Sequence, residues 1–310
     1  MAGAKRVAVI DVGTNSTRLL VADVEDGVVS PLERRSTVTR LGRGVDLSGH
    51  LSSEAIEDVC AAIGGYVETI EELGAETVDA IATSAVRDAD NGSAFVAELR
   101  ERFALSARVL DGEEEARLTY LGATSEALPS EPTLVVDIGG GSTELIVGSG
   151  SEISFHDSLQ AGVVRHTERH VNSDPPTAGE LEALATDVRG LIQDSIGAGV
   201  EARRGIAVAG TPTSLAAVAM ELEPYDPSRV HGHVLALPSI QVILSRLASL
   251  PLAERVEVTG LHPDRAPTIV AGVVILIETM RAFDLEEITV SEHDILYGTA
   301  LAAAQNPSTY

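Results

Sequence analysis

Apolar residues along the chain follow two different spacings, and each spacing predicts one kind of secondary structure. In the first 34 residues the apolar runs are short and are separated by turn-forming residues, which predicts strands joined by tight turns. From Leu51 to Leu73 apolar residues recur every three or four positions, which predicts a helix. Ser52 or Ser53 fits the N-cap of this helix, and Gly74 fits the residue that ends it. The three initial strands are expected at residues 6–11, 18–23 and 28–34.

Strands and helices alternate over the remainder of the chain, which is typical of an α/β fold. Pro129 and Pro132 interrupt this alternation and mark the expected boundary between two domains. Thr211 fits an N-cap, and Pro212 fits the first position of the helix that follows. Further strands are expected at residues 77–83, 105–110, 153–159, 206–209 and 288–290, and further helices at 92–102, 111–128, 163–170, 178–196, 213–222, 239–250, 267–283 and 294–305.

The stretch from Leu134 to Val147 is typical of a β-hairpin whose tip is bare backbone. Because glycine has no Cβ, the N–H groups at this tip can surround an anion, and two hydroxyl side chains add donors. Asp137 stands where the first strand meets the turn, a position suited to holding a metal ion or its water shell. A tight hairpin that binds no ligand is the alternative. The residues of the candidate phosphate loop are Gly139, Gly140, Gly141, Ser142 and Thr143.

A second copy of this hairpin lies near the start of the chain. Residues 9–21 align without a gap with residues 135–147, and seven of the 13 positions are identical. Two similar hairpins 126 residues apart suggest two related domains. Two acid-tipped loops on opposite walls of one cleft would grip a phosphate chain and its Mg²⁺ from both sides. The first copy supplies Asp11 as a metal ligand and Gly13, Thr14, Asn15 and Ser16 as phosphate-binding residues.

Composition narrows the class of protein. A chain of 310 residues with 44% hydrophobic content is long enough for two packed domains. Cys60 is the single cysteine, so an intramolecular disulfide is excluded and a cytoplasmic location is expected. No run of about 18 uncharged apolar residues is present, so no membrane span is expected. The net charge of −25, with Lys5 as the single lysine, argues against a nucleic-acid polymer as partner.

Several charged residues are candidates for chemistry at the loops. Glu113, Glu114 and Glu115 begin a helix, where they either complement the helix dipole or include a carboxylate that orients or deprotonates a water. Arg87 follows a strand and either forms a surface salt bridge or clamps phosphate oxygens with its planar guanidinium. Arg18 of the first hairpin aligns with Glu144 of the second; either residue is without a role, or Glu144 acts on metal or water.

Two histidine-containing stretches have weaker signals. Residues 165–170 hold two arginines and two histidines, which form either a solvated helix face or a track for a polyanion. His231 and His233 have no further Cys or His at a metal-like spacing, so they argue little for zinc. Neither a P-loop nor a dinucleotide-binding glycine motif occurs in its proper setting.

Taken together, the two loops resemble those of the exopolyphosphatase / guanosine pentaphosphate phosphohydrolase (Ppx/GppA) family, in its short two-domain form within the actin–Hsp70–sugar kinase superfamily. Either loop by itself is moderately specific, whereas the whole set of motifs in family order is highly specific. The other matching segments are residues 83–87, 112–117, 210–215, 231–235 and 291–298.

The resemblance implies two ribonuclease-H-like (actin-like ATPase) domains with mixed sheets flanked by helices, and an active site in the cleft between them. It places domain I at residues 1–125 with a returning helix at 296–310, and domain II at 126–295. It also implies Mg²⁺-dependent hydrolysis of the terminal phosphoanhydride of inorganic polyphosphate, and a homodimer. The family's phosphate-binding positions map onto Asn15, Arg87, Gly139 and Ser142, its catalytic carboxylate onto Glu115 or Glu114 with Glu115 favoured, and its acidic residues at metal and water onto Asp137 and Glu144.

Three other functions compete with polyphosphate hydrolysis. The nearest is removal of the 5′-terminal phosphate of guanosine pentaphosphate (pppGpp), because both substrates present the same terminal group. An ATP-dependent small-molecule kinase of the same superfamily would need an adenosine pocket and an acceptor site. A non-catalytic nucleotide sensor would bind its ligand without Mg²⁺-dependent release of phosphate.

Overall fold

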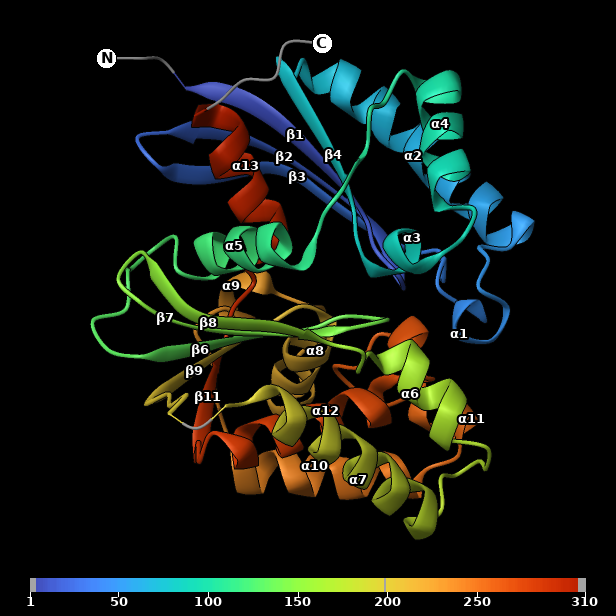
Figure 1. Ribbon diagram of the computed structural model, residues 1–310, viewed down its shortest axis with the longest axis vertical. Coiled ribbons are helices and arrows are strands. Elements are labelled where there is room, and N and C mark those ends of the chain that lie inside the picture. The colour runs from blue at the N-terminus through green and yellow to red at the C-terminus, as the bar shows by residue number, and fades with distance from the viewer. Residues whose placement is uncertain (1–3, 198, 306–310) are drawn as a thin grey trace. The chain divides into compact units, whose positions relative to one another are not determined.

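A computed structural model describes residues 4–197 and 199–305, which divide into two compact units (Figure 1). Unit 1 contains the described residues up to Ala127 together with those from His293 onward, and unit 2 runs from Leu128 to Glu292. The chain thus leaves unit 1, forms unit 2 as an insertion, and returns. The boundaries expected from the sequence, 125/126 and 295/296, lie a few residues from these positions.

Unit 1 is built on a mixed five-stranded sheet with the strand order β3-β2-β1-β4-β5. The first three strands form an antiparallel meander, because tight turns join them, and β4 and β5 add in parallel after helical crossovers. The strands are β1 (Lys5–Val12), β2 (Ser16–Glu25), β3 (Val28–Val38), β4 (Thr77–Ala82) and β5 (Arg108–Val109).

Helices cover both faces of the unit 1 sheet. Alternate residues of β1 enter two different cores: Ala8 and Ile10 pack toward α2 and α4, whereas Val7 and Val9 pack toward α13. A Cβ at Gly122 would lie 1.9 Å from the carbonyl oxygen of Asp294, so this glycine lets α5 and α13 pack backbone to backbone. The helices of unit 1 are α1 (Val45–Ser48), α2 (Ser53–Leu73), α3 (Ser84–Asp88), α4 (Gly92–Phe103), α5 (Gly112–Ala123) and α13 (Ile295–Gln305).

Unit 2 contains a mixed six-stranded sheet with the order β10-β11-β9-β6-β7-β8. As in unit 1, an antiparallel meander is followed by a strand, β9, that pairs in parallel with its first member. The strands are β6 (Thr133–Ile138), β7 (Thr143–Ser149), β8 (Glu152–Leu159), β9 (Arg204–Val208), β10 (Val234–Ala236) and β11 (Glu287–Val290).

The core of unit 2 lies between this sheet and a layer of helices. Helix α12 is buried along almost its whole length and contacts four of the others, α6, α7, α8 and α10. The helical segments are α6 (Val163–His170), α7 (Ala178–Ser195), α8 (Gly210–Ala219), α9 (Pro227–Val230), α10 (Leu237–Ser249), α11 (Leu252–Arg255), the 3₁₀ turn η1 (Pro263–Arg265) and α12 (Ile269–Ala282). None of the helices described in either unit is long and apolar enough to cross a membrane.

Most of the predicted elements are present, and the differences are a few element boundaries and some short additional elements. Helix α2 has Ser52 as its N-cap and Gly74 in the left-handed conformation at its end, as predicted. Helix α8 begins earlier than predicted, since Ala209 rather than Thr211 is its N-cap and Thr211 is buried inside the first turn. Helix α5 ends at Ala123 rather than Leu128, and the strand expected at 105–110 shrinks to β5. The three-residue strand β10 was not predicted.

Candidate active site

The first hairpin loop joins β1 to β2 and is closed by its own backbone. The N–H group of Gly13 donates to the carbonyl oxygen of Ser16 at 3.1 Å. The Thr14 hydroxyl lies 2.8 Å from the Ser84 hydroxyl and accepts the backbone N–H of Ala85 at 3.2 Å. These bonds fix the loop against the start of α3, so the Thr14 side chain positions the loop.

Two buried donors at this loop have no hydrogen-bond partner within the described residues. They are the amide nitrogen Nδ2 of Asn15 and the hydroxyl of Ser16, and both residues are less than 10% exposed. Leaving a buried donor unsatisfied costs about 1–3 kcal/mol, so such groups are rare in a folded protein without a functional reason. An anion with several oxygens would satisfy both donors.

The acid of the first hairpin, Asp11, is joined to the last helix through Arg18. Arg18 donates from Nε and Nη2 to Oδ2 of Asp11 at 2.9 and 2.6 Å, and its Nη1 donates to Oδ2 of Asp294. Asp11 and Asp294 are 2% and 3% exposed. Burial raises the pKa of Asp11 above its usual value, although Arg18 opposes the shift. No local signal assigned Asp294 a role, although this residue lies in one of the family-like segments.

Glu115 is a further buried carboxylate of unit 1. It stands in the first turn of α5, where Asp111 is the N-cap, and it is 6% exposed. Nη1 of Arg87 donates to Oε2 of Glu115 at 2.7 Å and to the carbonyl oxygen of Leu110 at 3.0 Å. Burial raises the pKa of Glu115, with smaller contributions of the same sign from Asp11 and Asp88, and Arg87 opposes the shift. A carboxylate in this setting is poised to accept a proton.

The structure separates Glu115 from its neighbour Glu114. Oε1 of Glu114 lies 2.5 Å from Nη1 of Arg108, and both side chains are about one-third or more exposed. Glu114 therefore belongs to a surface ion pair, whereas Glu115 is turned into the interior beside Arg87. Of the two predicted candidates, the geometry favours Glu115 as the catalytic carboxylate.

The second hairpin loop, between β6 and β7, is closed in the same way as the first. Gly139 donates its N–H to the carbonyl oxygen of Ser142 at 3.0 Å. The carbonyl groups of the three glycines accept bonds from the first turn of α6, including a 2.8 Å bond from Nε of Arg165 to the carbonyl oxygen of Gly141. A Cβ at Gly162 would lie 2.2 Å from the carbonyl oxygen of Gly140, so only glycine allows this close approach.

The two acidic residues of the second hairpin are neighbours on adjacent strands. Asp137 and Glu144 are directly paired in the register of β6 and β7, as Asp11 and Arg18 are in β1 and β2. Both carboxylates are at least nine-tenths buried, and Oε1 of Glu144 accepts the hydroxyl of Ser158 at 2.9 Å. The Thr143 hydroxyl donates to the carbonyl oxygen of Ala161, so its expected role as a phosphate donor finds no support. Ser142 is 2% exposed.

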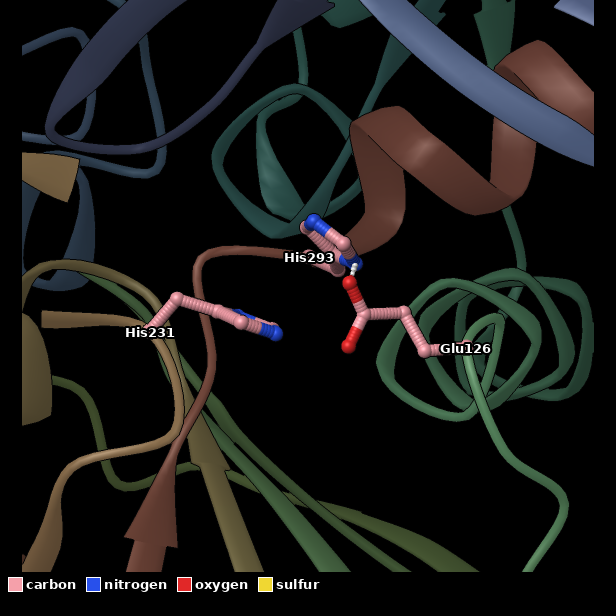
Figure 2. Close-up of side chains that lie close together, drawn as sticks. All are labelled: Glu126, His231 and His293. Atoms are coloured by element: carbon pink, nitrogen blue, oxygen red, sulfur yellow. Dashed lines mark ion pairs between the residues drawn. The ribbon is translucent and has the colours of Figure 1, made fainter. Parts of the chain in front are cut away.

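The histidine-containing stretches have structural partners. In unit 2, Nδ1 of His231 accepts the backbone N–H of Glu292 at 3.1 Å. In unit 1, Glu126 and His293 point toward one another, with 4.0 Å between Oε1 and Nδ1 (Figure 2). The stretch 165–170 is not simply a solvated helix face, because His166 is completely buried.

The residues present fit a hard divalent cation, which prefers carboxylate oxygens. In the first hairpin, Oδ1 of Asp11 is buried and accepts no hydrogen bond from any described residue. In the second, Asp137 and Glu144 offer two further carboxylates. These carboxylates stand on the strands directly beside the two candidate phosphate loops, where Mg²⁺ bound to a phosphate would be held.

Two helix-flanked mixed sheets, each with an acid-tipped hairpin loop, define the two-domain phosphate-binding proteins of actin-like fold. A model of the family described as "Ppx/GppA phosphatase family" matches residues 20–302. The chain therefore belongs to the Ppx/GppA phosphatase family, as its motifs predicted.

Relatives of known identity cover nearly the whole chain. A protein of Mycobacterium tuberculosis named exopolyphosphatase 2 is 36% identical over 315 residues, which span 96% of this chain and 98% of that protein. The crystal structure of the Ppx/GppA family member of Aquifex aeolicus matches with a TM-score of 0.84 and 31% identity, covering 98% of this chain and 100% of that one. An exopolyphosphatase structure from Cytophaga hutchinsonii matches with a TM-score of 0.88 and 25% identity, covering 97% of each chain. The predicted fold class, two actin-like domains with mixed sheets, is confirmed by these structures.

Proposed function

We propose that the protein is an exopolyphosphatase, which hydrolyses the terminal phosphoanhydride of inorganic polyphosphate and releases orthophosphate. The observation that carries this proposal is the pair of unsatisfied buried donors on Asn15 and Ser16. Their loop is hydrogen-bonded to helix α3, and α3 contains Arg87, which binds Glu115. Donors at a glycine-containing turn suit a phosphoryl group. The relationship to exopolyphosphatase 2 of M. tuberculosis supports the same substrate class.

Glu115 is assigned the role of general base. Its carboxylate takes a proton from a water molecule, the water oxygen forms a bond to the terminal phosphorus, and the bridging P–O bond breaks. The electron pair of that bond leaves with the shortened polyphosphate. Burial raises the pKa of Glu115, which makes the carboxylate a stronger base than an exposed one, and the bond from Arg87 fixes its orientation.

The remaining loop residues bind the phosphate and stabilise its charge. Asn15 and Ser16 supply donors from the first loop, and Gly13 holds the turn closed. The second phosphate loop consists of Gly139, Gly140, Gly141 and Ser142. Backbone N–H groups of α6 donate to carbonyl oxygens of this loop. That the two loops face one another across a cleft remains part of the proposal. Fixed donors aimed at the phosphoryl oxygens are the main source of rate enhancement in phosphoryl transfer.

Magnesium completes the proposal. Asp11, Asp137 and Glu144 are the residues that would hold Mg²⁺, and the bound ion would neutralise phosphate charge as the P–O bond breaks. Arg18 binds Oδ2 of Asp11, so Oδ1 of Asp11 is the oxygen that would bind the ion.

The test is phosphate release from polyphosphate by the wild-type protein, with Mg²⁺ and with a chelator, beside the matched variants Glu115→Gln and Glu114→Gln. We expect Glu115→Gln to lower kcat by about 10²–10⁴-fold, the usual contribution of a general base. Glu114→Gln should retain near wild-type activity, because Glu114 pairs with Arg108 at the surface. Equal loss in both variants, or none in either, would overturn the assignment.

The same assay separates the competing substrates. Turnover on polyphosphates of several lengths is compared with turnover on pppGpp at equal concentrations. Higher kcat/KM on pppGpp would replace the proposed substrate with the nucleotide, and transfer of phosphate to an acceptor without release to water would replace hydrolysis with kinase activity.

Two further properties belong to the proposal. We expect a homodimer, which light scattering behind a sizing column measures, and a cytoplasmic location, which fits the single cysteine, Cys60, buried in the core of unit 1.

A further inference from the structure

Helices α6 and α7 both belong to unit 2 (Figure 1). Between them they supply three potential metal ligands that lie close together. His166 and His170 lie one turn apart on α6, and Asp187 lies on α7. Oδ2 of Asp187 is 3.5 Å from Nε2 of His166 and 2.8 Å from Nε2 of His170. The two imidazole rings are 5.6 Å apart between centroids, so both reach the same carboxylate from one face of the helix.

His166 is the unusual member of this cluster. The side chain is completely buried, and neither ring nitrogen forms a hydrogen bond with any residue in the described part of the chain. Asp187 Oδ2, at 3.5 Å from Nε2, is near the ring but does not complete a hydrogen bond, and a buried polar ring without one is costly unless another group satisfies it. Imidazole nitrogens are common metal ligands, so a bound ion is one group that would satisfy the ring.

We propose that His166, His170 and Asp187 bind one divalent transition-metal ion of the zinc class. Two histidines at positions i and i+4 of a helix present both rings to a single ion, as in the helical zinc sites of metalloproteins. Ligand atoms around a tetrahedral Zn²⁺ with bonds of about 2.0–2.2 Å lie about 3.3 Å apart. The two distances to Asp187 Oδ2, 2.8 and 3.5 Å, bracket that spacing.

The composition of the cluster selects the ion. Two imidazole nitrogens and one carboxylate oxygen suit Zn²⁺, whereas Mg²⁺ prefers an all-oxygen shell. The ion has a path from solvent, because the side chains of His170 and Asp187 are 18% and 35% exposed. Nη1 of Arg169 lies 3.9 Å from Asp187 Oδ2, and its side chain is 42% exposed, so the guanidinium is not enclosed with the three ligands.

A bound ion would act on the loop already described. It would tie α6 to α7, and the first turn of α6 carries the hydrogen bonds to the carbonyl groups of Gly139, Gly140 and Gly141. The metal would therefore stiffen the support of the second phosphate loop without touching substrate. The binding of the ion does not depend on the proposed function, since it is measured without any substrate.

The experiment measures Zn²⁺ alone, in chelator-treated full-length protein. Metal content after dialysis gives the stoichiometry, competition with a chromophoric chelator gives the affinity, and the visible absorption of Co²⁺ in place of Zn²⁺ reports the coordination geometry. The variants are His166→Leu, His170→Gln and Asp187→Asn. We expect one Zn²⁺ per chain in the wild type and at least about a tenfold weaker affinity in each variant, because the loss of outer-shell partners alone weakens metal sites by 10- to 100-fold.

Two controls distinguish this site from adventitious binding. His262 and Asp264 form an exposed pair with 3.8 Å between Nδ1 and Oδ2, so His262→Gln should leave the affinity unchanged. A large excess of Mg²⁺ should not displace the Zn²⁺. Asp187→Asn changes a partly exposed side chain and keeps the test decisive if His166→Leu fails to fold. Zn²⁺ affinity that is equal in wild type and all three variants, or the lack of stoichiometric binding in the wild type, would overturn the proposal.

Discussion

Nη1 of Arg87 lies 2.7 Å from Oε2 of Glu115, and this ion pair joins the short helix α3 to the first turn of α5. The Arg87 side chain is 24% exposed and that of Glu115 8%, so the pair is largely shielded from solvent. Arg87 thus has a task before any phosphate arrives, which is to hold the proposed base in place. The sequence offered a choice between a surface salt bridge and a phosphate clamp, and the structure adds this third role.

Replacing Arg87 should affect both stability and catalysis. Arg87→Met removes a charged hydrogen bond and leaves the Glu115 carboxylate buried without its cation, so we expect a loss of about 1.5–3 kcal/mol in the free energy of unfolding. Urea denaturation measures this loss. Arg108→Met, which breaks the ion pairs of a half-exposed guanidinium with Glu114 and Asp79, should lose less than the buried pair, about 1 kcal/mol or below for each contact. Equal losses in the two variants would contradict the difference in burial.

The activity should depend on pH through Glu115. Burial raises the pKa of this carboxyl above its ordinary value of 4.5, and only the ionised form accepts a proton. The acid limb of kcat/KM should therefore lie above pH 4.5 and disappear in Glu115→Gln, while Glu114→Gln keeps it. The folded state binds the proton more tightly than the unfolded state, so this group makes the protein less stable as pH rises from the unfolded pKa through the folded one. An unchanged limb in Glu115→Gln would remove Glu115 from the role of base.

The ion pairs of Arg18 should be important for stability. Arg18→Leu leaves the buried carboxylates of Asp11 and Asp294 without a counter-charge, and we expect a loss of about 3–5 kcal/mol at pH 7. The loss should shrink as pH falls, because burial raises the pKa of Asp11 and this carboxylate becomes protonated. Thermal unfolding at several pH values tests this. The more exposed pair of Arg6 and Asp23 provides the control, since Arg6→Leu should lose much less.

The unsatisfied donors of the first loop predict that removing one of them weakens substrate binding without lowering stability. Ser16→Ala removes a buried hydroxyl that has no partner in the described protein, so stability should stay the same or rise by up to about 1–3 kcal/mol. The same variant should raise KM for polyphosphate. Chemical denaturation and steady-state kinetics are measured on one preparation. A variant that loses stability and keeps its KM would show that the hydroxyl serves the fold instead.

Close approach at Gly162 predicts a sensitive position near the second loop. Gly162→Ala places a methyl group 2.2 Å from the Gly140 carbonyl oxygen, so the loop or α6 must move, and we expect lower activity and lower stability. Gly190→Ala in α7 is the matched control, because a Cβ there meets nothing within 4 Å. That control should gain about 0.5–1 kcal/mol, the usual difference between alanine and glycine inside a helix. Similar behaviour of the two variants would contradict the tight packing.

The hydrophobic and polar pattern by itself determined most of the secondary structure and the repeated hairpin. Strand periodicity, the Ser52 cap and the Gly74 stop are local properties, because they depend on residues within one turn or one strand. The family followed from the same local signals, read as an ordered set. Helix α8 was misplaced at its start because Thr211 and Pro212 carry cap-like chemistry, whereas the chain begins the helix at Ala209 and buries Thr211 against α12.

The tertiary structure alone decided which charged residues meet. Arg18 and Asp294 are separated by 276 residues, and no local pattern reports a contact of that kind. Glu114 and Glu115 are neighbours with the same side chain, yet the helix turns one to the surface and the other to Arg87. The same holds for His166, because the sequence allowed a solvated helix face or a polyanion track, whereas the side chain is buried where α6 packs against α7 and α12. Burial and long-range pairing arise from the packing of whole elements against one another. The sequence pattern shows which face of each element is apolar, but it does not show which other element packs against that face.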